Sequence, residues 1–184
     1  MKIPKDRIGV LIGPEGKVKE EIERRLRVKI RVDSEEGDVS IGLPPENDDP
    51  STVFRAKEVV LSIGRGFSPE KAFNLLEDED AFLEIIDLRE FVGRSSSEVN
   101  RVKGRVIGKE GKMRKVIEEL TETFISVYGH TVSIIGRMEN VQVAKEAITM
   151  LINGSEHSTV NRFLDRKRRE LKSKALELWE RPKR

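Results

Sequence analysis

The feature that most constrains this chain is a short glycine motif that occurs twice, 95 positions apart. It reads IGVLIGPEGK at positions 8–17 and KGRVIGKEGK at positions 103–112. In both copies two glycines are separated by two residues, a spacing that lets a backbone turn pass close to another group without a Cβ in the way. Apolar residues then recur at helical spacing, in the second copy as Met113, Val116, Ile117 and Leu120. The motif therefore predicts a duplicated domain in which each glycine turn opens a helix.

Positive charge is concentrated around the second glycine turn. Positions 94–115 contain eight basic and two acidic residues, a local net charge of +6, whereas the whole chain has a net charge of only +2. The N-terminus of a helix also offers free N–H groups and the positive end of the helix dipole to an anion. Together these features predict a binding site for a phosphate backbone, and we interpret that backbone as RNA.

The first glycine turn has different surroundings. Pro14 stands where the second copy has Lys109, which removes both a charge and a backbone N–H donor. Segment 33–50 contains seven acidic residues and no basic one, and it should repel a phosphate chain. We therefore expect RNA to bind mainly to the second copy. The loop of the first copy is expected to bind weakly or to serve as a scaffold, and it consists of Gly13, Pro14, Glu15 and Gly16.

Length and composition exclude several kinds of protein. With 184 residues, the chain has room for two small domains, each near the lower size limit for an independent core. The absence of cysteine excludes disulfides, thiolate nucleophiles and cysteine-ligated zinc. No apolar run is long enough to span a membrane and no signal peptide is evident, so we expect a cytoplasmic protein.

Catalytic motifs are also missing. The glycine turns are not P-loops, because Val106 stands where the first P-loop glycine would be and Met113 follows Lys112. The two histidines, His130 and His157, are predicted to be exposed, one in a hairpin turn and one before a helix. We therefore predict a protein that is not an enzyme, with no catalytic residue, metal site or cofactor.

Hydrophobic periodicity predicts the elements of each copy. The first copy should contain helices at 8–12, 17–27, 53–63 and 69–76, strands at 28–32 and 39–41, and the end of a largely missing strand at 2–4. The second should contain a strand at 82–91, a helix whose N-cap lies in the stretch Ser95-Ser96-Ser97-Glu98, the glycine turn and its helix, a hairpin of strands 124–128 and 131–135, and a helix at 141–152.

A final helix is predicted at 158–179. Its apolar stripe consists of Val160, Leu164, Leu171, Ala175 and Leu178. Its other faces are crowded with basic residues, namely Arg162, Arg166, Lys167, Arg168, Arg169, Lys172 and Lys174. Two interpretations stay open: a helix docked on the second domain with a solvated basic face, or an arm that contacts RNA phosphates or a partner protein.

The order strand, helix, glycine turn, helix, strand, strand, helix resembles the type I (eukaryotic-type) KH domain. Segments 83–93, 102–111 and 128–136 are similar to the partner-of-Nob, or Dim-two, family of archaeal and eukaryotic pre-ribosomal RNA factors. The resemblance implies an α+β fold of two tandem KH domains, each a three-stranded sheet packed by three helices. The expected division is 1–76, 77–154 and a C-terminal helix at 155–184.

The resemblance also implies where RNA binds. In a KH domain the glycine loop clamps the backbone of about four nucleotides, and the bases lie in an adjacent groove. The expected site in the second copy comprises the loop, its basic flanks and an apolar wall. Its residues are Arg101, Val102, Arg105, Val106, Ile107, Gly108, Lys109, Glu110, Gly111, Lys112, Arg114, Lys115, Ile125 and Val127.

The function implied by the family is that of a small-subunit ribosome biogenesis factor. Such a protein would bind pre-ribosomal RNA near the 3′ end and position a separate processing endonuclease as its protein partner. Two alternatives stay open: a general tandem-KH adaptor for other RNAs, and a protein–protein scaffold in which neither glycine loop contacts RNA.

Overall fold

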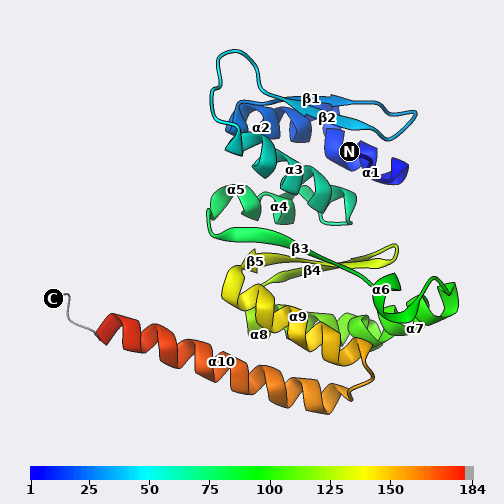
Figure 1. The fold of residues 1–184 in the computed structure, drawn as a ribbon, viewed down its shortest axis with the longest axis vertical. Coiled ribbons are helices and arrows are strands. Elements are labelled where there is room, and N and C mark those ends of the chain that lie inside the picture. The colour runs from blue at the N-terminus through cyan, green and yellow to red at the C-terminus, as the bar shows by residue number, and fades with distance from the viewer. Residues whose placement is uncertain (181–184) are drawn as a thin grey trace. The chain divides into compact units, whose positions relative to one another are not determined.

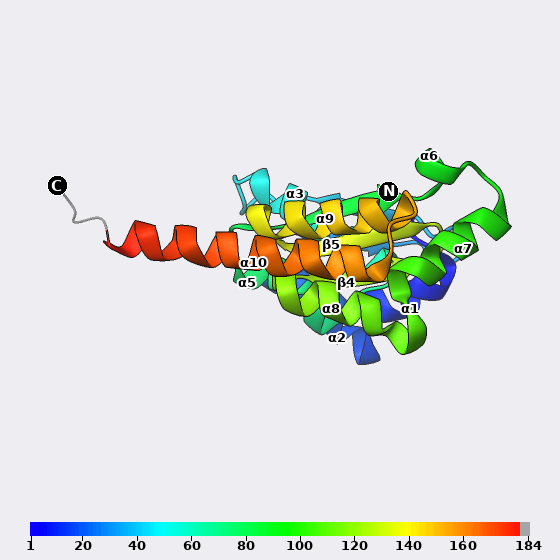
Figure 2. The ribbon, with the colours of Figure 1, turned by 90° about the horizontal axis from the view of Figure 1, so that it is seen from below.

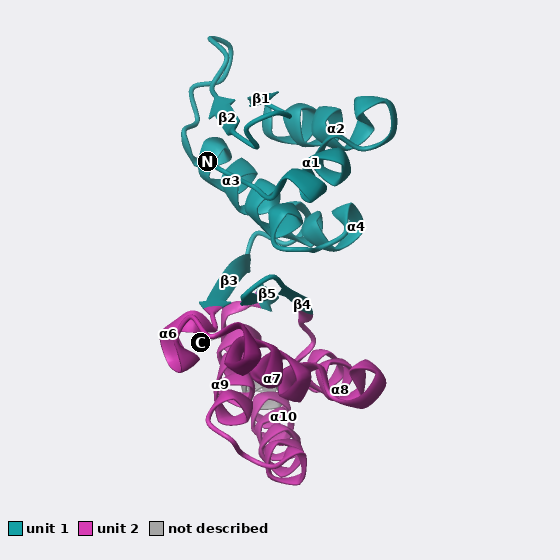
Figure 3. Cartoon of the chain, turned by 90° about the vertical axis from the view of Figure 1, so that its right-hand side faces the viewer, with its two compact units in different colours: residues 1–86, 125–136 teal, residues 87–124, 137–184 magenta. Residues whose placement is uncertain are grey.

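A computed structural model of the protein describes residues 1–180, with side chains as far as Ser173. The chain divides into two compact units (Figure 3). Unit 1 comprises residues 1–86 and 125–136, and unit 2 comprises residues 87–124 together with the chain from 137 onward. Because the 125–136 hairpin of the second copy clusters with unit 1, this division differs from the chain-order domains expected from the repeat. Those domain boundaries stay a prediction.

Unit 1 begins with the first glycine motif and the elements around it (Figure 1). In chain order these are α1 (Lys5–Ile12), the 3₁₀ turn η1 (Pro14–Gly16), α2 (Lys17–Leu26), β1 (Lys29–Val32), β2 (Val39–Gly42) and α3 (Ser51–Gly64). The three helices contact one another through apolar faces on which Leu11, Ile22 and Val59 are fully buried. α1 and α3 start earlier than predicted, because the polar residues of a first turn add nothing to the apolar period.

The N-terminal residues extend the first hairpin. β1 and β2 are antiparallel, and Lys2 forms an isolated bridge with Asp38 beside them. The Ile3 N–H donates to the Gly37 carbonyl at 3.0 Å. A Cβ on Gly37 would lie 2.7 Å from the Ile3 carbonyl oxygen, so this close pairing requires glycine. The expected strand end at 2–4 is therefore present only as an isolated bridge beside the β1–β2 hairpin.

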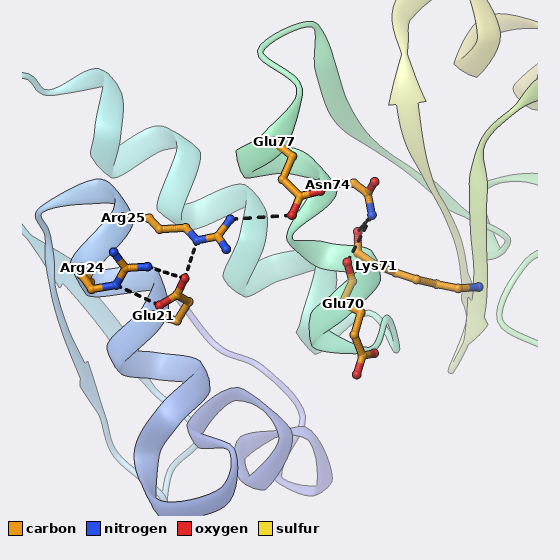
Figure 4. Close-up of polar contacts among 7 residues, drawn as sticks. All are labelled: Glu21, Arg24, Arg25, Glu70, Lys71, Asn74 and Glu77. Carbon is orange, nitrogen blue, oxygen red and sulfur yellow. Dashed lines mark hydrogen bonds and ion pairs between the residues drawn. The ribbon is translucent and has the colours of Figure 1, made fainter.

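Two short helices follow where a single helix at 69–76 was predicted. They are α4 (Pro69–Ala72) and α5 (Asn74–Glu77), with Phe73 between them. The Asn74 side-chain amide donates to the Lys71 carbonyl at 3.1 Å across this break (Figure 4).

The second copy follows the predicted order of elements. It contains β3 (Ala81–Asp87), α6 (Arg89–Val92), α7 (Ser96–Ile107), the 3₁₀ turn η2 (Lys109–Gly111), α8 (Lys112–Thr121), β4 (Phe124–Tyr128), β5 (Thr131–Arg137) and α9 (Met138–Ile152). The strands form one sheet in the order β3-β5-β4. β5 is central in the sheet, and its residues 131–135 are all buried.

The predicted strand at 82–91 is wrong in its last part. β3 ends at Asp87, whose carboxylate accepts a hydrogen bond from the Arg89 N–H at 2.9 Å. Such a side-chain bond to a backbone group two residues on is a local turn. The chain therefore leaves the sheet and forms α6, although the apolar residues on which the strand was predicted continue to Phe91.

The last helix, α10 (His157–Glu180), packs against α8 and α9 within unit 2 (Figure 2). Val160 and Leu164 are fully buried and Leu171 is half-buried, which confirms that part of the apolar stripe. Phe163 is buried as well and was not predicted. The side chains of Ala175, Leu178 and Lys174 lie outside the described residues. None of the helices in the described part of the chain has the length and apolarity needed to cross a membrane.

Candidate nucleic-acid interface

The loop between α7 and α8 has a backbone that glycine makes possible. Gly108 has φ 72° and ψ 177°, a conformation open essentially to glycine alone. A Cβ there would lie 2.7 Å from the Met113 Cβ. Glu110 and Gly111 then adopt left-handed conformations with φ 54° and 75°. The Gly111 N–H donates to the Gly108 carbonyl at 3.2 Å and closes a tight turn directly before α8.

The loop between α1 and α2 has nearly the same backbone. Gly13 has φ 73° and ψ 175°, and Glu15 and Gly16 have φ 53° and 81°. The Gly16 N–H donates to the Gly13 carbonyl, again at 3.2 Å. The duplication inferred from the glycines therefore extends to the geometry of both loops, so any difference between them lies in the side chains.

The helix behind the second loop begins without a competing anion. α8 has no side-chain hydrogen bond to its N-cap region and no acidic residue in its first turn. The free N–H groups of a helix start and the positive end of its dipole attract anions. In the first copy, by contrast, Glu20 lies in the first turn of α2. The second loop thus presents an uncompensated positive helix end.

Lysines surround this helix end. Lys109, Lys112 and Lys115 line a concave surface of η2 and α8, together with Glu110, Val116 and Glu119. Within the described part of the chain, neither these three lysines nor Arg114 forms an ion pair. All three lysines are exposed and Arg114 is half-buried. Their charges are therefore available to an external anion.

The equivalent cations of the first copy are already paired. Lys17 lies 2.7 Å from Glu15, and Lys19 lies 4.0 Å from Glu23. Exposed pairs of this kind are weak, so they reduce the local positive potential more than they stabilise the fold. Pro14 contributes no N–H to this loop, as predicted from the sequence.

Further along α2, two arginines are held by one carboxylate (Figure 4). Arg24 and Arg25 both donate to Glu21, at 2.7 Å and 2.5 Å, and Arg25 also lies 3.8 Å from Glu77 of α5. These two hydrogen bonds lower the pKa of Glu21 from 4.5 to about 2, and the bond from Arg24 contributes more than the bond from Arg25. The positive charge on α2 is therefore satisfied within unit 1.

One carboxylate of the β1–β2 turn, that of Asp33, is stabilised by backbone hydrogen bonds. The backbone N–H groups of Glu36 and Glu35 donate to the Asp33 carboxylate at 3.1 Å and 2.9 Å. These two bonds lower the pKa of Asp33, and the bond from the Glu36 N–H has the larger effect. The first copy thus combines paired cations with a hairpin turn rich in acidic residues.

Two arginines expected at the site have partners inside the protein. Arg105 donates from Nε to the Leu151 carbonyl at 3.0 Å and from Nη2 to the Ser155 carbonyl at 2.8 Å. It thereby satisfies the C-terminal end of α9, where helix carbonyls lack intrahelical donors. Arg7 makes the same kind of paired bonds to two carbonyls at and just beyond the end of α3. Arg101 forms an exposed ion pair with a glutamate one turn earlier in α7, at 2.7 Å.

The expected apolar wall is only partly at the surface. Val102 and Val106 are fully buried and Ile125 exposes 1% of its surface, so these side chains belong to the core. Ile107 and Val127 are half-buried and keep accessible surface. Val116 and Glu119 line the concave surface but were not expected there, although both lie on the same helical face as Lys112.

Two KH-domain profiles match the sequence of this chain. The profile of the eukaryotic-type KH domain (KH-domain type I) matches residues 82–169, and that of the KH domain matches residues 1–62. A KH domain-containing protein of Methanocaldococcus jannaschii is 49% identical over 179 residues, which cover 97% of this chain and 78% of that protein. The chain belongs to the KH-domain family. The predicted fold class of two KH domains is thereby confirmed. In the first copy, however, a two-stranded sheet and one isolated bridge stand where a three-stranded sheet was predicted.

Two further relatives narrow the subgroup of KH proteins. The pre-rRNA-processing protein PNO1 of Coccidioides immitis is 24% identical over 153 residues, covering 83% of this chain and 60% of that protein. The crystal structure of an a/eIF2alpha–aDim2p–rRNA complex from Pyrococcus horikoshii includes a similar chain. The two share 48% identity and a TM-score of 0.86, with 92% and 93% of the chains covered. This KH protein is thus homologous to the PNO1/Dim2 factors, which confirms the family resemblance. It spans 60% of the length of the PNO1 relative.

Proposed function

We propose that this protein binds single-stranded RNA through the glycine loop of its second copy. The observation that carries the proposal is the uncapped start of α8, behind a turn with the KH geometry and beside Lys109, Lys112 and Lys115, which have no partner in the described residues. Backbone N–H groups would hold a phosphate, and the three lysines would neutralise its neighbours. The half-buried Ile107, directly before the loop, would offer apolar surface to the bases.

Glu110 does not prevent this binding. Its left-handed backbone is part of the turn, and its exposed side chain forms no ion pair within the described residues. The carboxylate is therefore free to rotate away from a phosphate that only backbone donors need to contact. In the first copy the corresponding Glu15 lies beside Lys17, so the same residue type lowers the charge available to RNA.

We further propose that the RNA is small-subunit pre-ribosomal RNA near its 3′ end. The support comes from the PNO1 and Dim2 relatives, whose names refer to pre-rRNA processing and to an rRNA complex. The protein would present the strand to a separate endonuclease and would cleave nothing itself. The proposed domains are 1–76, 77–154 and a C-terminal segment at 155–184, of which 181–184 lie outside the described residues. The paired charges of the first domain favour a scaffolding role for it.

The test is a pair of matched double variants. Lys109→Asp with Glu110→Asp should reduce RNA affinity at least about tenfold, because it reverses one phosphate-facing charge at an exposed loop. Aspartate tolerates the left-handed conformation, so the fold should persist. Pro14→Asp with Glu15→Asp places the same two aspartates in the first copy, where the charge changes by −1 instead of −2, and should alter affinity less than about twofold. Binding is measured by fluorescence anisotropy, with circular dichroism as the folding control.

The outcomes separate the parts of this proposal. Equal losses from both double variants would contradict the dominance of the second copy. No loss from the Lys109 and Glu110 variant would contradict RNA binding by the loop. Equal affinity for a 3′-terminal rRNA fragment and its scrambled version would leave the KH function and remove the ribosomal one. RNA cleavage that depends on an acidic residue would contradict the non-catalytic role.

A further inference from the structure

The outward face of α10 carries a row of basic side chains. Arg162, Arg166, Arg169 and Lys172 follow one another at spacings of four, three and three residues, which place them along one side of a helix. All four are exposed. The opposite side is buried through Val160 and Leu164 against unit 2. The helix is thus docked by its apolar side, and the basic row, from Arg162 to Lys172, points to solvent over about 15 Å.

Most of this charge is not neutralised internally. Arg162, Arg169 and Lys172 form no ion pair within the described residues, although Arg169 does donate to a backbone carbonyl one turn earlier. Arg166 has a distant partner in Glu170, at 3.9 Å. Residues 157–173 contain six basic and two acidic residues. The row therefore presents a net positive surface.

The start of α10 is fixed next to the helix that leads into the glycine loop. The His157 Nε2 lies 2.9 Å from the Arg105 carbonyl oxygen, and Arg105 itself donates to the Ser155 carbonyl at 2.8 Å. Arg105 is only three residues before Gly108, so the first turn of α10 adjoins the loop. Arg162 follows His157 by five residues, about 8 Å along the helix. RNA extending beyond the clamp can therefore meet the basic row.

We propose that the outward face of α10, formed by Arg162, Arg166, Arg169 and Lys172, is a second phosphate-binding surface. It would hold RNA that flanks the nucleotides clamped by the glycine loop, and it rests on the proposed RNA function of that loop. Arginine suits this task because its planar guanidinium donates in pairs to phosphate oxygens. A membrane surface is a poorer ligand, since an interfacial helix inserts an apolar face and that of α10 is already buried.

The experiment compares two RNA lengths with two charge-matched variants of the full chain. The test variant is Arg162→Gln, Arg169→Gln and Lys172→Gln. The control is Lys5→Gln, Lys29→Gln and Arg31→Gln, which removes three exposed charges from unit 1. One RNA has about five nucleotides, enough for the glycine clamp, and the other extends the same core to about fifteen. Glutamine is a good helix former, so α10 should persist in the test variant.

The test variant should leave the affinity for the short RNA unchanged within about twofold, because the clamp alone binds it. Its affinity for the long RNA should fall about tenfold at physiological salt, and the slope of log K against log salt should become shallower by about 2, for three lost contacts at ~0.7 each. The control variant should change the affinity for neither RNA by more than about twofold. Anisotropy titrations at several salt concentrations measure all of these values.

Two results would overturn the proposal. One is an unchanged affinity and salt slope for the long RNA, the result expected if the row serves an acidic protein or only solvation. The other is an equal loss for both lengths, or an equal loss in the control, which would indicate a general effect of net charge. A failure of the proposed loop function would be recognised by a different result, because the Lys109→Asp and Glu110→Asp variant would then bind the short RNA with unchanged affinity.

Discussion

Alanine at the glycines of the second loop should affect stability in a fixed order. Gly104 lies inside α7 with a negative φ, and a Cβ there would meet nothing within 4 Å. Gly111 has φ 75° and ψ 11°, and the nearest atom to a Cβ would be Arg114 Nη2 at 4.0 Å. Gly108 combines an unfavourable backbone with Met113 atoms at 2.7 Å and 2.9 Å from a Cβ. A Cβ at Gly104 thus meets neither backbone strain nor a steric overlap, one at Gly111 meets backbone strain alone, and one at Gly108 meets both.

The magnitudes follow from these terms. Gly104→Ala should stabilise the protein by about 0.5–1 kcal/mol, the usual helix preference of alanine over glycine. Gly111→Ala should destabilise it by about 1–2 kcal/mol, the strain of a left-handed residue with a Cβ. Gly108→Ala adds a steric overlap with backbone and should cost roughly 4 kcal/mol. That last value is a large part of the roughly 5–15 kcal/mol that stabilises a typical domain.

Urea unfolding followed by far-ultraviolet circular dichroism measures the three free energies, provided that the m-values agree among the variants. Gly9→Ala, Gly16→Ala and Gly13→Ala provide the matched series in the first copy, where a Cβ on Gly13 would lie 2.8 Å from the Val18 Cβ. The same order is expected there. Equal losses at Gly108 and Gly111 would refute the steric reasoning, and a destabilised Gly104→Ala would refute the assignment of that glycine to a plain helical position.

Two further predictions concern charged side chains. Arg105→Ala should lower the free energy of unfolding by about 2–3 kcal/mol, because two carbonyls lose a charged donor. Arg101→Ala should lower it by less than about 1 kcal/mol. Thermal unfolding compares the two variants, and equal shifts in Tm would contradict the internal role of Arg105. The carboxyl of Glu21 should titrate with a pKa of about 2, and mutation of both Arg24 and Arg25 to Gln should return it toward 4.5. Since its pKa is lowered on folding, its contribution to stability is present above pH 4.5 and lost as the pH falls toward 2. A carbon-detected NMR titration reads this value, and a midpoint near 4.5 in the unmodified protein would contradict the paired geometry.

Helices with a clear apolar period were predictable from the sequence. α9 buries its whole predicted stripe, whereas α2 and α8 bury the middle of theirs through Ile22 and Ile117 and leave other members half-buried. The ends of α2 and α9 differ from the predicted ends by at most three residues. The strand that ends at Asp87 was predicted too long, because apolar residues continue past a turn that depends on one carboxylate–backbone hydrogen bond. Periodicity reports burial, and it is blind to such single local bonds.

The candidate site was predictable in its loop and less so in its flanks. The glycine spacing indicated the turn itself, since φ values near 72° and 75° at Gly108 and Gly111 require that residue type. The role of Arg105 depends on carbonyls 46 and 50 residues later in the chain, so no local pattern could reveal it. A count of basic residues cannot distinguish a cation that faces solvent from one that caps a helix inside the protein.

The two glycine loops share one backbone geometry and differ in the charges around it. Both loops adopt the same strained turn, and both have the helix behind it, yet their charges are arranged in opposite ways. Lys17 has a carboxylate 2.7 Å away, while Lys112 has none in the described residues. A phosphate approaching the first loop must displace the Glu15 carboxylate from Lys17, whereas no such anion pairs with Lys112 in the described residues. Under the proposed function, the turn would supply the clamp in either copy, and the unpaired lysines would decide which copy can use it.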